Sequence, residues 1–162
     1  MSAAPSDALE PEEILRDLLR LDAGLRVEPY YGEQAIFYNP GAVAPLGTIF
    51  CAIKDHDGPN DRASRLSRPG VYRFAFGMTP GSFERHFGAP PRRPTKGEAL
   101  SLAGHDLTRL DELTPHPVYA WMGWVQILAP TAARFGDVRP LLRESLDMVR
   151  AKWTRRIPSA TI

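Results

Sequence analysis

The sequence of 162 residues has very little cysteine, few lysines and no long hydrophobic run. Its single cysteine, Cys51, excludes an intramolecular disulfide and a metal site built from cysteines. The longest nearly apolar run, residues 118–129, has 12 residues, fewer than the ~18–20 that cross a bilayer. The N-terminal segment MSAAPSDALEPEE has neither a basic start nor an apolar stretch. We therefore expect no signal peptide, no membrane association and a cytoplasmic location.

An excess of one charge sign is also lacking, since 20 basic and 19 acidic side chains leave a formal net charge of +1. The distribution is uneven, because residues 1–69 carry a net charge of −4 and residues 70–162 a net charge of +5. The overall balance argues against a dedicated nucleic-acid binder, which needs a concentrated basic surface. Only three cations are lysines. Arginine suits forked recognition of anions, but genome composition is the simpler explanation of this bias.

The remaining composition is that of an ordinary globular domain. Apolar residues make up 43% and charged residues 24% of the chain, which excludes the disordered, collagen-like and membrane-spanning classes. The length is close to that of one domain and allows a core without disulfides or metals. We predict a flexible tail over residues 1–8, which are small and polar, and a single domain over residues 9–157.

Hydrophobic spacing and turn residues divide this domain into short elements. Ile14, Leu15 and Leu18 form an apolar stripe behind a proline and two acidic residues, which predicts a helix that ends by Gly24. Thr79 and the proline after it are typical of the beginning of a second helix. The predicted strands cover residues 25–31, 33–39, 48–54, 71–78 and 118–128, and further helices cover residues 80–87, 107–113 and 138–155.

The strand predicted over residues 71–78 shows the clearest alternation of side chains. Large apolar residues share one face and smaller or charged residues share the other: Tyr72, Phe74, Phe76 and Met78 against Val71, Arg73, Ala75 and Gly77. Such a strand is typical of an antiparallel sheet with one covered and one more open face. The element order therefore predicts an α+β fold, a two-layer sandwich whose antiparallel sheet is covered on one face by the N- and C-terminal helices.

Several segments carry a resemblance to a known family. They are the strand Gly70-Val71-Tyr72-Arg73-Phe74 with Thr79-Pro80 and Phe83 after it, and the helix Pro140-Leu141-Leu142-Arg143-Glu144-Ser145-Leu146. With the N-terminal helix and the meander, these segments resemble the MmcQ/YjbR family. Two further segments resemble an uncharacterised bacterial branch of such domains: Asp57-Gly58-Pro59-Asn60-Asp61-Arg62-Ala63-Ser64 and Pro115-His116-Pro117-Val118-Tyr119-Ala120-Trp121-Met122-Gly123-Trp124. By element order the resemblance covers nearly all of residues 9–155. It implies a frataxin (CyaY)-like fold, a predicted DNA-binding role and no catalytic motif.

We expect any ligand to bind on the open face of the sheet. Arg73 lies on that face and could stack a planar ligand together with one of Trp121 and Trp124. The tryptophans are three positions apart in the predicted strand, so they should point to opposite faces. Alternatively, both are covered, one by helices and the other by loops. A tyrosine from Tyr30, Tyr31 or Tyr38 would join this site, and the two prolines around His116 would present its ring beside the sheet.

The loop after residue 54 is the densest polar cluster of the chain. Its carboxylates could bind a hard cation, but the EF-hand pattern fails, since Gly58 stands at loop position 4 and Leu66 at position 12. The alternative is turn chemistry, with Asp57 opening a turn and Asn60 or Asp61 capping the next one. We predict a structural clasp, with no metal and no other cofactor. Asp57, Asn60 and Arg62 remain candidate ligand-binding residues.

No catalytic motif stands out. The sequence has no G-x-S-x-G elbow, no Walker loop and no G-x-G-x-x-G. Cys51 lies in an alternating strand, which predicts a buried, inert thiol. His105 and Asp106 could pair as a base and its orienter, but no nucleophile accompanies them.

Three hypotheses about function stay open. The first is a non-catalytic binding module whose open face holds a small ligand or nucleic acid, the latter bound weakly by Arg92, Arg93 and Lys96. The second is a small-molecule enzyme that uses histidine and aspartate side chains of the loops. The third is a structural domain that binds a protein partner or forms a homodimer.

Overall fold

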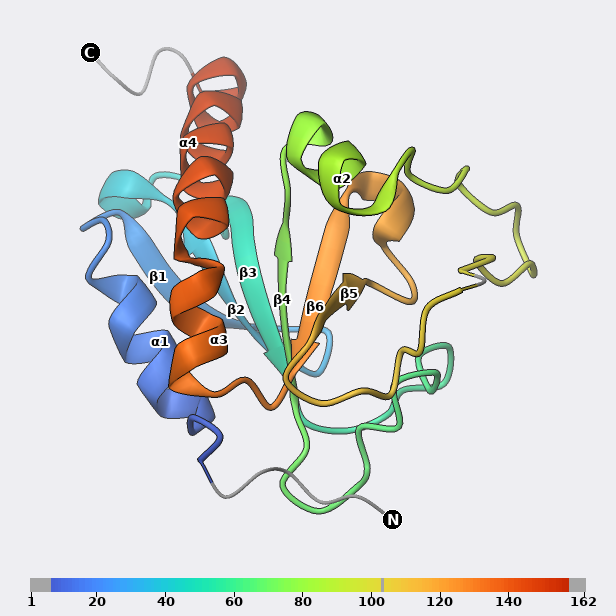
Figure 1. The fold of residues 1–162 in the computed structure, drawn as a ribbon. Helices are drawn as coiled ribbons and strands as arrows, with labels where there is room; N and C mark the ends of the chain where they lie inside the picture. Colours follow the sequence, from blue (N-terminus) through green and yellow to red (C-terminus); the bar gives the residue numbers. More distant parts are fainter. Residues whose placement is uncertain (1–6, 103, 158–162) are drawn as a thin grey trace.

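The computed structural model describes residues 7–102 and 104–157 (Figure 1). Within these residues the chain forms six strands, four α-helices and two 3-10 helices. In chain order they are α1 (Pro11–Leu19), β1 (Leu25–Tyr30), β2 (Glu33–Tyr38), η1 (Pro40–Ala42), β3 (Thr48–Lys54), β4 (Arg73–Gly77), α2 (Pro80–Phe87), β5 (Leu113–Pro115), η2 (Ala120–Met122), β6 (Trp124–Leu128), α3 (Ala132–Asp137) and α4 (Arg139–Arg156).

The strands described form one antiparallel sheet in the order β1-β2-β3-β4-β6-β5. Its first four strands are a meander, and β5 and β6 extend the sheet beyond β4 as a second antiparallel pair. Figure 1 shows α1, α3 and α4 together on one face of this sheet. The structure therefore confirms the predicted fold class, an α+β sandwich in which N- and C-terminal helices cover one face of an antiparallel sheet.

The covered face of the sheet carries the main hydrophobic core. The large apolar side chains of the 71–78 segment lie in it, as their alternation predicts, with Phe74 and Phe76 fully buried. Helix α4 contributes a stripe at helical spacing, formed by Leu142, Leu146, Val149 and Trp153. Full burial of a side chain of this size stabilises the fold by roughly 1.5–3 kcal/mol. Because this core takes one side of every strand, a binding site on the sheet has to lie on the opposite face.

The two helices predicted from their first residues begin where expected. At α1, Pro11 occupies the first turn and the backbone N–H of Glu10 donates to Oε1 of Glu13 at 3.1 Å, which completes a capping box. At α2, Oγ1 of Thr79 accepts from the backbone N–H of Ser82 at 3.3 Å. These bonds satisfy backbone donors that the first helical turn leaves unpaired.

The opposite face, which we call the open face, is only partly covered. A small cluster of Ala35, Phe37 and Ala52 lies on it near the β1 edge. Toward β6, the loops that include Leu66 and Leu110 pack on the sheet. Between these two regions lies Ala75 of β4, whose short side chain leaves room on the sheet.

The sequence prediction was wrong between residues 107 and 124. Residues 107–113, all of which the structure describes, form no helix, and β5, which begins at Leu113, pairs with β6. The strand predicted from residue 118 begins only at Trp124, because residues 120–122 form the 3-10 helix η2 and Gly123 adopts φ 85°. Trp121 is therefore not in a strand, and the argument that placed it opposite Trp124 on the sheet does not apply.

The predicted N-terminal tail falls largely outside the structure, since residues 1–6 are not among the described residues. Ala8, which the prediction included in the tail, forms an isolated antiparallel bridge with Thr131 and packs against the core. The backbone N–H of Leu9 donates to the carbonyl of Pro130 at 2.8 Å. The described chain is therefore attached to the domain from Ala8 onward.

Candidate functional site

Arg73 lies on the open face, as predicted, but its side chain is fully buried. Its Nη1 and Nη2 donate to the two carboxylate oxygens of Asp61 at 2.6 Å each, and its Nε donates to Oε1 of Gln126 at 2.8 Å. A buried guanidinium requires such partners because an unpaired charge inside a protein is costly. The prediction that Arg73 stacks on a ligand is therefore wrong, since Asp61 holds it within the sheet.

Further polar side chains surround this pair, and we call Lys54, Asp61, Ser64, Arg73 and Gln126 the buried polar cluster. Nζ of Lys54 lies 2.9 Å from Oδ2 of Asp61, and the hydroxyl of Ser64 donates to Oε1 of Gln126 at 2.9 Å. Burial acts to raise the pKa of Asp61, but the hydrogen bonds and charges of Arg73 and Lys54 hold it well below its usual range. Two cations share one carboxylate, which leaves the cluster with a formal charge of +1.

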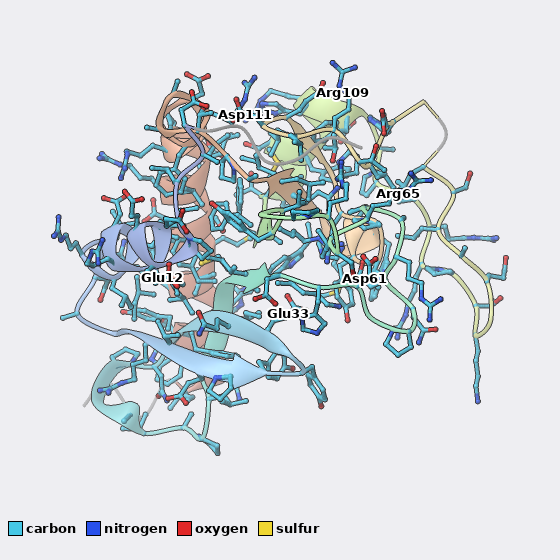
Figure 2. The ribbon with its side chains drawn as sticks, turned by 90° about the horizontal axis from the view of Figure 1, so that it is seen from below. Glu12, Glu33, Asp61, Arg65, Arg109 and Asp111 are labelled. Carbon is cyan, nitrogen blue, oxygen red and sulfur yellow. The ribbon has the colours of Figure 1, made fainter. Side chains whose placement is uncertain are left out.

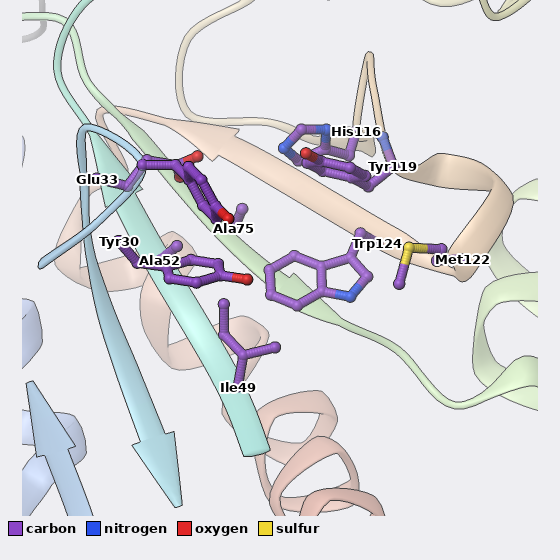
Figure 3. A pocket seen from close by; sticks show the side chains of 10 residues that line it. Tyr30, Glu33, Ile49, Ala52, Ala75, His116, Tyr119, Met122 and Trp124 are labelled. Carbon is purple, nitrogen blue, oxygen red and sulfur yellow. Dashed lines mark hydrogen bonds between the residues drawn. The ribbon is translucent and has the colours of Figure 1, made fainter. Parts of the chain in front are cut away.

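A hollow of about 210 Å³ lies beside this cluster on the open face (Figure 3), and we call it the open-face pocket. Its floor consists of sheet side chains, Ile49 and Ala52 from β3 and Ala75 from β4. The short alanines at the middle of the sheet leave the space that longer side chains would fill. Its walls are mostly aromatic and are formed by Tyr30, Tyr31, Tyr119, Met122 and Trp124. Its polar side chains, Glu33 and His116, come from different parts of the chain.

The walls of the pocket hold most of the exposed large apolar side chains. Within the described residues five such side chains are exposed, and Tyr30, Tyr31, Tyr119 and Met122 line the pocket. A monomer seldom gathers its exposed apolar side chains at one place unless that place binds something. The concentration therefore marks the pocket, and not the whole open face, as the candidate site.

Tyr31 is the most exposed of these residues, at 86%, and its backbone is strained. Tyr31 and Gly32 connect β1 to β2 with φ angles of 50° and 77°, a two-residue hairpin turn that favours Asn-Gly. A residue with a Cβ atom loses roughly 1–2 kcal/mol in the left-handed region. Strain of this kind clusters at functional sites, so an exposed tyrosine at this position indicates a role at the rim of the pocket.

Glu33 supplies the carboxylate of the pocket from the first position of β2. Burial raises the pKa of Glu33 above its ordinary value, although the charges of Arg73 and Lys54 act to lower it. Figure 2 shows Glu33 between the β1–β2 hairpin and the segment that carries Asp61, and the charge of Asp61 also acts to raise this pKa. Among the described residues no hydrogen bond or ion pair occupies the Glu33 carboxylate. When ionised, Glu33 balances the +1 charge of the buried polar cluster.

His116 also faces the pocket, and its ring is almost fully buried, with 2% exposed. Its Nδ1 accepts hydrogen bonds from the backbone N–H groups of Val118 and Tyr119, at 3.0 and 3.1 Å. A nitrogen that accepts carries no proton, so the neutral ring is protonated at Nε2. Burial and the nearby charge of Arg73 hold the pKa of His116 well below its ordinary value. The ring is therefore a neutral hydrogen-bond donor at neutral pH.

Trp124, and not Trp121, faces the open-face pocket. Trp124 lies opposite Gly77 in the sheet, and a Cβ atom at Gly77 would come within 3.0 Å of its indole Nε1, so the glycine makes room for the ring. Trp121 contacts the proline-rich loop instead, where the guanidinium of Arg93 lies 4.6 Å from its ring centroid. Tyr38 is no part of the site, because its ring packs on Trp153 at the helical face.

The other predicted binding residues lie outside the pocket. Asp57 holds the loop after β3, since its carboxylate accepts from the backbone N–H of Leu66 at 2.8 Å and from the hydroxyl of Ser67 at 3.3 Å. Asp57 therefore makes turn bonds of the kind that the predicted clasp requires, whereas Asp61, one of the two predicted caps, pairs with Arg73 instead. Asn60 and Arg62 are exposed on the same loop and line neither the pocket nor the buried polar cluster. Arg92 and Lys96 are exposed on the proline-rich loop.

The structure assembles no catalytic or metal centre from the remaining candidates. Asp106 accepts from the backbone N–H and the hydroxyl of Thr108, while the ring of His105 packs against Phe87, so His105 and Asp106 form no base and orienter. Cys51 is buried, as predicted, and burial raises the pKa of its thiol. Among the described residues no group of three or more His, Cys, Asp or Glu could hold a metal ion, and no helix is long and apolar enough to span a membrane.

Sequence reasoning missed Glu33, Tyr119 and Met122 as site residues. For Glu33 a signal existed, since it alternates with Ala35 and Phe37 on the same side of a predicted strand, directly after a glycine turn. No comparable signal marked Tyr119 and Met122, because the segment that contains them reads as a continuous strand and folds instead as a turn and the helix η2.

Fold and site together define a small α+β domain with an aromatic pocket on the open face of its sheet. Residues 9–158 match a protein family described as a family of unknown function (DUF6194). The match covers most of the chain, which therefore belongs to this family. No match was found among curated proteins or among solved structures.

Proposed function

We propose that this protein is a non-catalytic binding module that takes a small planar organic molecule in the open-face pocket. One observation carries the proposal, namely that four exposed large apolar side chains surround a single hollow. Ligand sites are typically concave and mostly apolar, with a few polar groups that fix orientation. Aromatic walls and the two polar residues Glu33 and His116 fit that description.

The size and charge of the site favour a small molecule over nucleic acid. The hollow of about 210 Å³ suits a small ring system. The cations of the buried polar cluster, Arg73 and Lys54, are occupied by Asp61 and are not exposed to phosphates. We also propose that the domain is related to the MmcQ/YjbR family and shares its frataxin-like fold. The order of the helices and strands supports this relationship. We propose a cytoplasmic location as well, which the single free cysteine supports.

A fragment screen by ligand-observed NMR tests the proposal, with planar aromatic and heteroaromatic compounds as probes. The variant Ala75→Leu fills the floor of the pocket and should abolish binding. Ala133→Leu makes the same change at an exposed position of α3, on the other face of the sheet, and should leave binding intact. The proposal is overturned when no fragment binds the native protein, or when Ala75→Leu binds the same fragments as well as the native protein does.

Two alternatives are decided by parallel measurements. A nucleic-acid partner would use the exposed loop cations, and three to six phosphate contacts would give a log–log salt slope of about −3 to −5 on duplex DNA. Absence of binding at ~10 µM protein and ~50 mM salt would exclude it, since even non-specific binders are detectable there. A homodimer would shield the exposed Tyr31, and sedimentation of the native protein would then give twice the mass of the chain.

A further inference from the structure

We infer that the ligand of the open-face pocket is an uncharged heteroaromatic ring with an N–H donor beside a carbonyl acceptor, held between Glu33 and His116. This inference rests on the proposed function and names the class of molecule that the pocket selects. It follows from three features of the site, which are its hydrogen-bonding groups, its local charge and its aromatic walls.

The hydrogen-bonding groups define complementary requirements. His116 lines the pocket, and its neutral ring can act there only as a donor, because its Nδ1 is occupied by two backbone N–H groups and the proton is on Nε2. No hydrogen bond among the described residues uses this Nε2–H. An ionised Glu33 can only accept, and its carboxylate is equally unoccupied. A ligand that satisfies both therefore presents an acceptor to His116 and a donor to Glu33.

The local charge excludes a ligand with a strong net charge. When Glu33 is ionised, its carboxylate and that of Asp61 balance Lys54 and Arg73, and His116 is neutral, so these groups sum to zero. A bound cation would meet Lys54 and Arg73 without a spare carboxylate. A bound anion would meet Glu33 while both cations are already paired. Beside the buried side chains of Arg73 and His116 either excess of charge is costly.

The walls favour a flat ring system. Figure 3 shows the Tyr30 ring and the Trp124 indole on one side of the hollow, and Glu33 and His116 along the other. Aromatic side chains stack on planar rings, and the alanine floor of Ala52 and Ala75 permits close approach of the ligand to the sheet. A ring that carries its polar groups along one edge can stack and hydrogen-bond at the same time.

The test is a panel of matched ligands titrated against the full-length protein by calorimetry. Quinazolin-4-one presents an N–H next to a carbonyl, its 3-methyl derivative loses the N–H, and naphthalene lacks both groups. Phenyltrimethylammonium and benzoate provide the cation and the anion. We expect quinazolin-4-one to bind at least about tenfold more tightly than each of the others, because loss of one partner leaves a buried polar group unsatisfied.

The outcomes separate this inference from the proposed function. If naphthalene, the cation or the anion binds as tightly as quinazolin-4-one, the pocket binds ligands but the inference is wrong. If no compound of the panel binds, and the fragment screen also finds no ligand, the proposed function fails with it.

Substitutions and NMR spectra test the roles of Glu33 and His116 in binding. Glu33→Gln should weaken quinazolin-4-one by about tenfold and leave naphthalene unchanged, because a charge-assisted acceptor is lost. Glu28→Gln removes a carboxylate of β1 that does not line the pocket and should change neither affinity. A long-range 1H–15N spectrum of the native protein should show His116 protonated at Nε2, with this resonance shifted by the ligand. Protonation at Nδ1, or an unshifted Nε2, would overturn the role of His116.

Discussion

Replacing Asp61 with alanine should lower the free energy of unfolding by about 3–5 kcal/mol, the usual loss when one partner of a buried ion pair is removed. This loss of stability is at the upper end of the range for a single substitution. Arg73 has no exposed surface and would lose two bonds of 2.6 Å, and Lys54 would lose its contact at 2.9 Å. Both cations would remain within the sheet without the carboxylate that pairs with them. A loss of this size is a large share of the roughly 5–15 kcal/mol that stabilises an average domain.

Urea unfolding followed by circular dichroism measures this loss. Asp55→Ala is the matched control, because Asp55 belongs to the same loop and is exposed, and its contact with the His56 ring should contribute less than about 1 kcal/mol. The triple variant Asp61→Leu, Arg73→Met and Lys54→Met removes all three charges and should recover most of the stability. A loss below about 1 kcal/mol for Asp61→Ala, or a triple variant no more stable than the single one, would refute the reasoning.

The same carboxylate predicts how stability depends on pH. The pKa of Asp61 is lower in the folded protein than in the unfolded chain, so its contribution is complete above about pH 4, the ordinary pKa of aspartate. As the pH falls below that value the unfolded chain binds a proton that the folded protein does not, and stability decreases. Asp61→Asn cannot titrate, and its unfolding free energy should fall less steeply with acid than that of the native protein.

Three other predictions follow from single contacts. Tyr31→Asn should raise the free energy of unfolding by about 1 kcal/mol, because asparagine tolerates positive φ. The same variant should bind the fragments of the pocket more weakly. If thermal denaturation shows that the variant is less stable than the native protein, the backbone of Tyr31 is not strained. Cys51 should not react with a thiol reagent in the native protein at neutral pH, and rapid labelling would contradict its burial. Asp57→Ala should cost about 1 kcal/mol through loss of its turn bonds, whereas a rise in melting temperature with calcium, magnesium or zinc that this variant abolishes would identify a metal site instead.

Local patterns determined the parts of this fold that depend on neighbours along the chain. The alternation from Tyr72 to Met78 separated the core face from the open face, because side chains of a strand point to opposite sides regardless of what covers them. Thr79 defined the beginning of α2, because an N-cap bonds within its own first turn. Asp57 indicated a clasp because its partners lie about ten residues away in the same loop.

Tertiary structure decided the site. Arg73 looked available because nothing in its strand shows that Asp61, from a different segment, would accept hydrogen bonds from both of its terminal nitrogens. The pocket joins Glu33 of a hairpin with His116 of a turn that precedes β6, and only the pairing of strands brings them to one hollow. Sequence spacing records contacts within a turn of chain, whereas ion pairs and pockets form between segments whose proximity is set by packing. That is why the open face was predictable from the sequence and its chemistry was not.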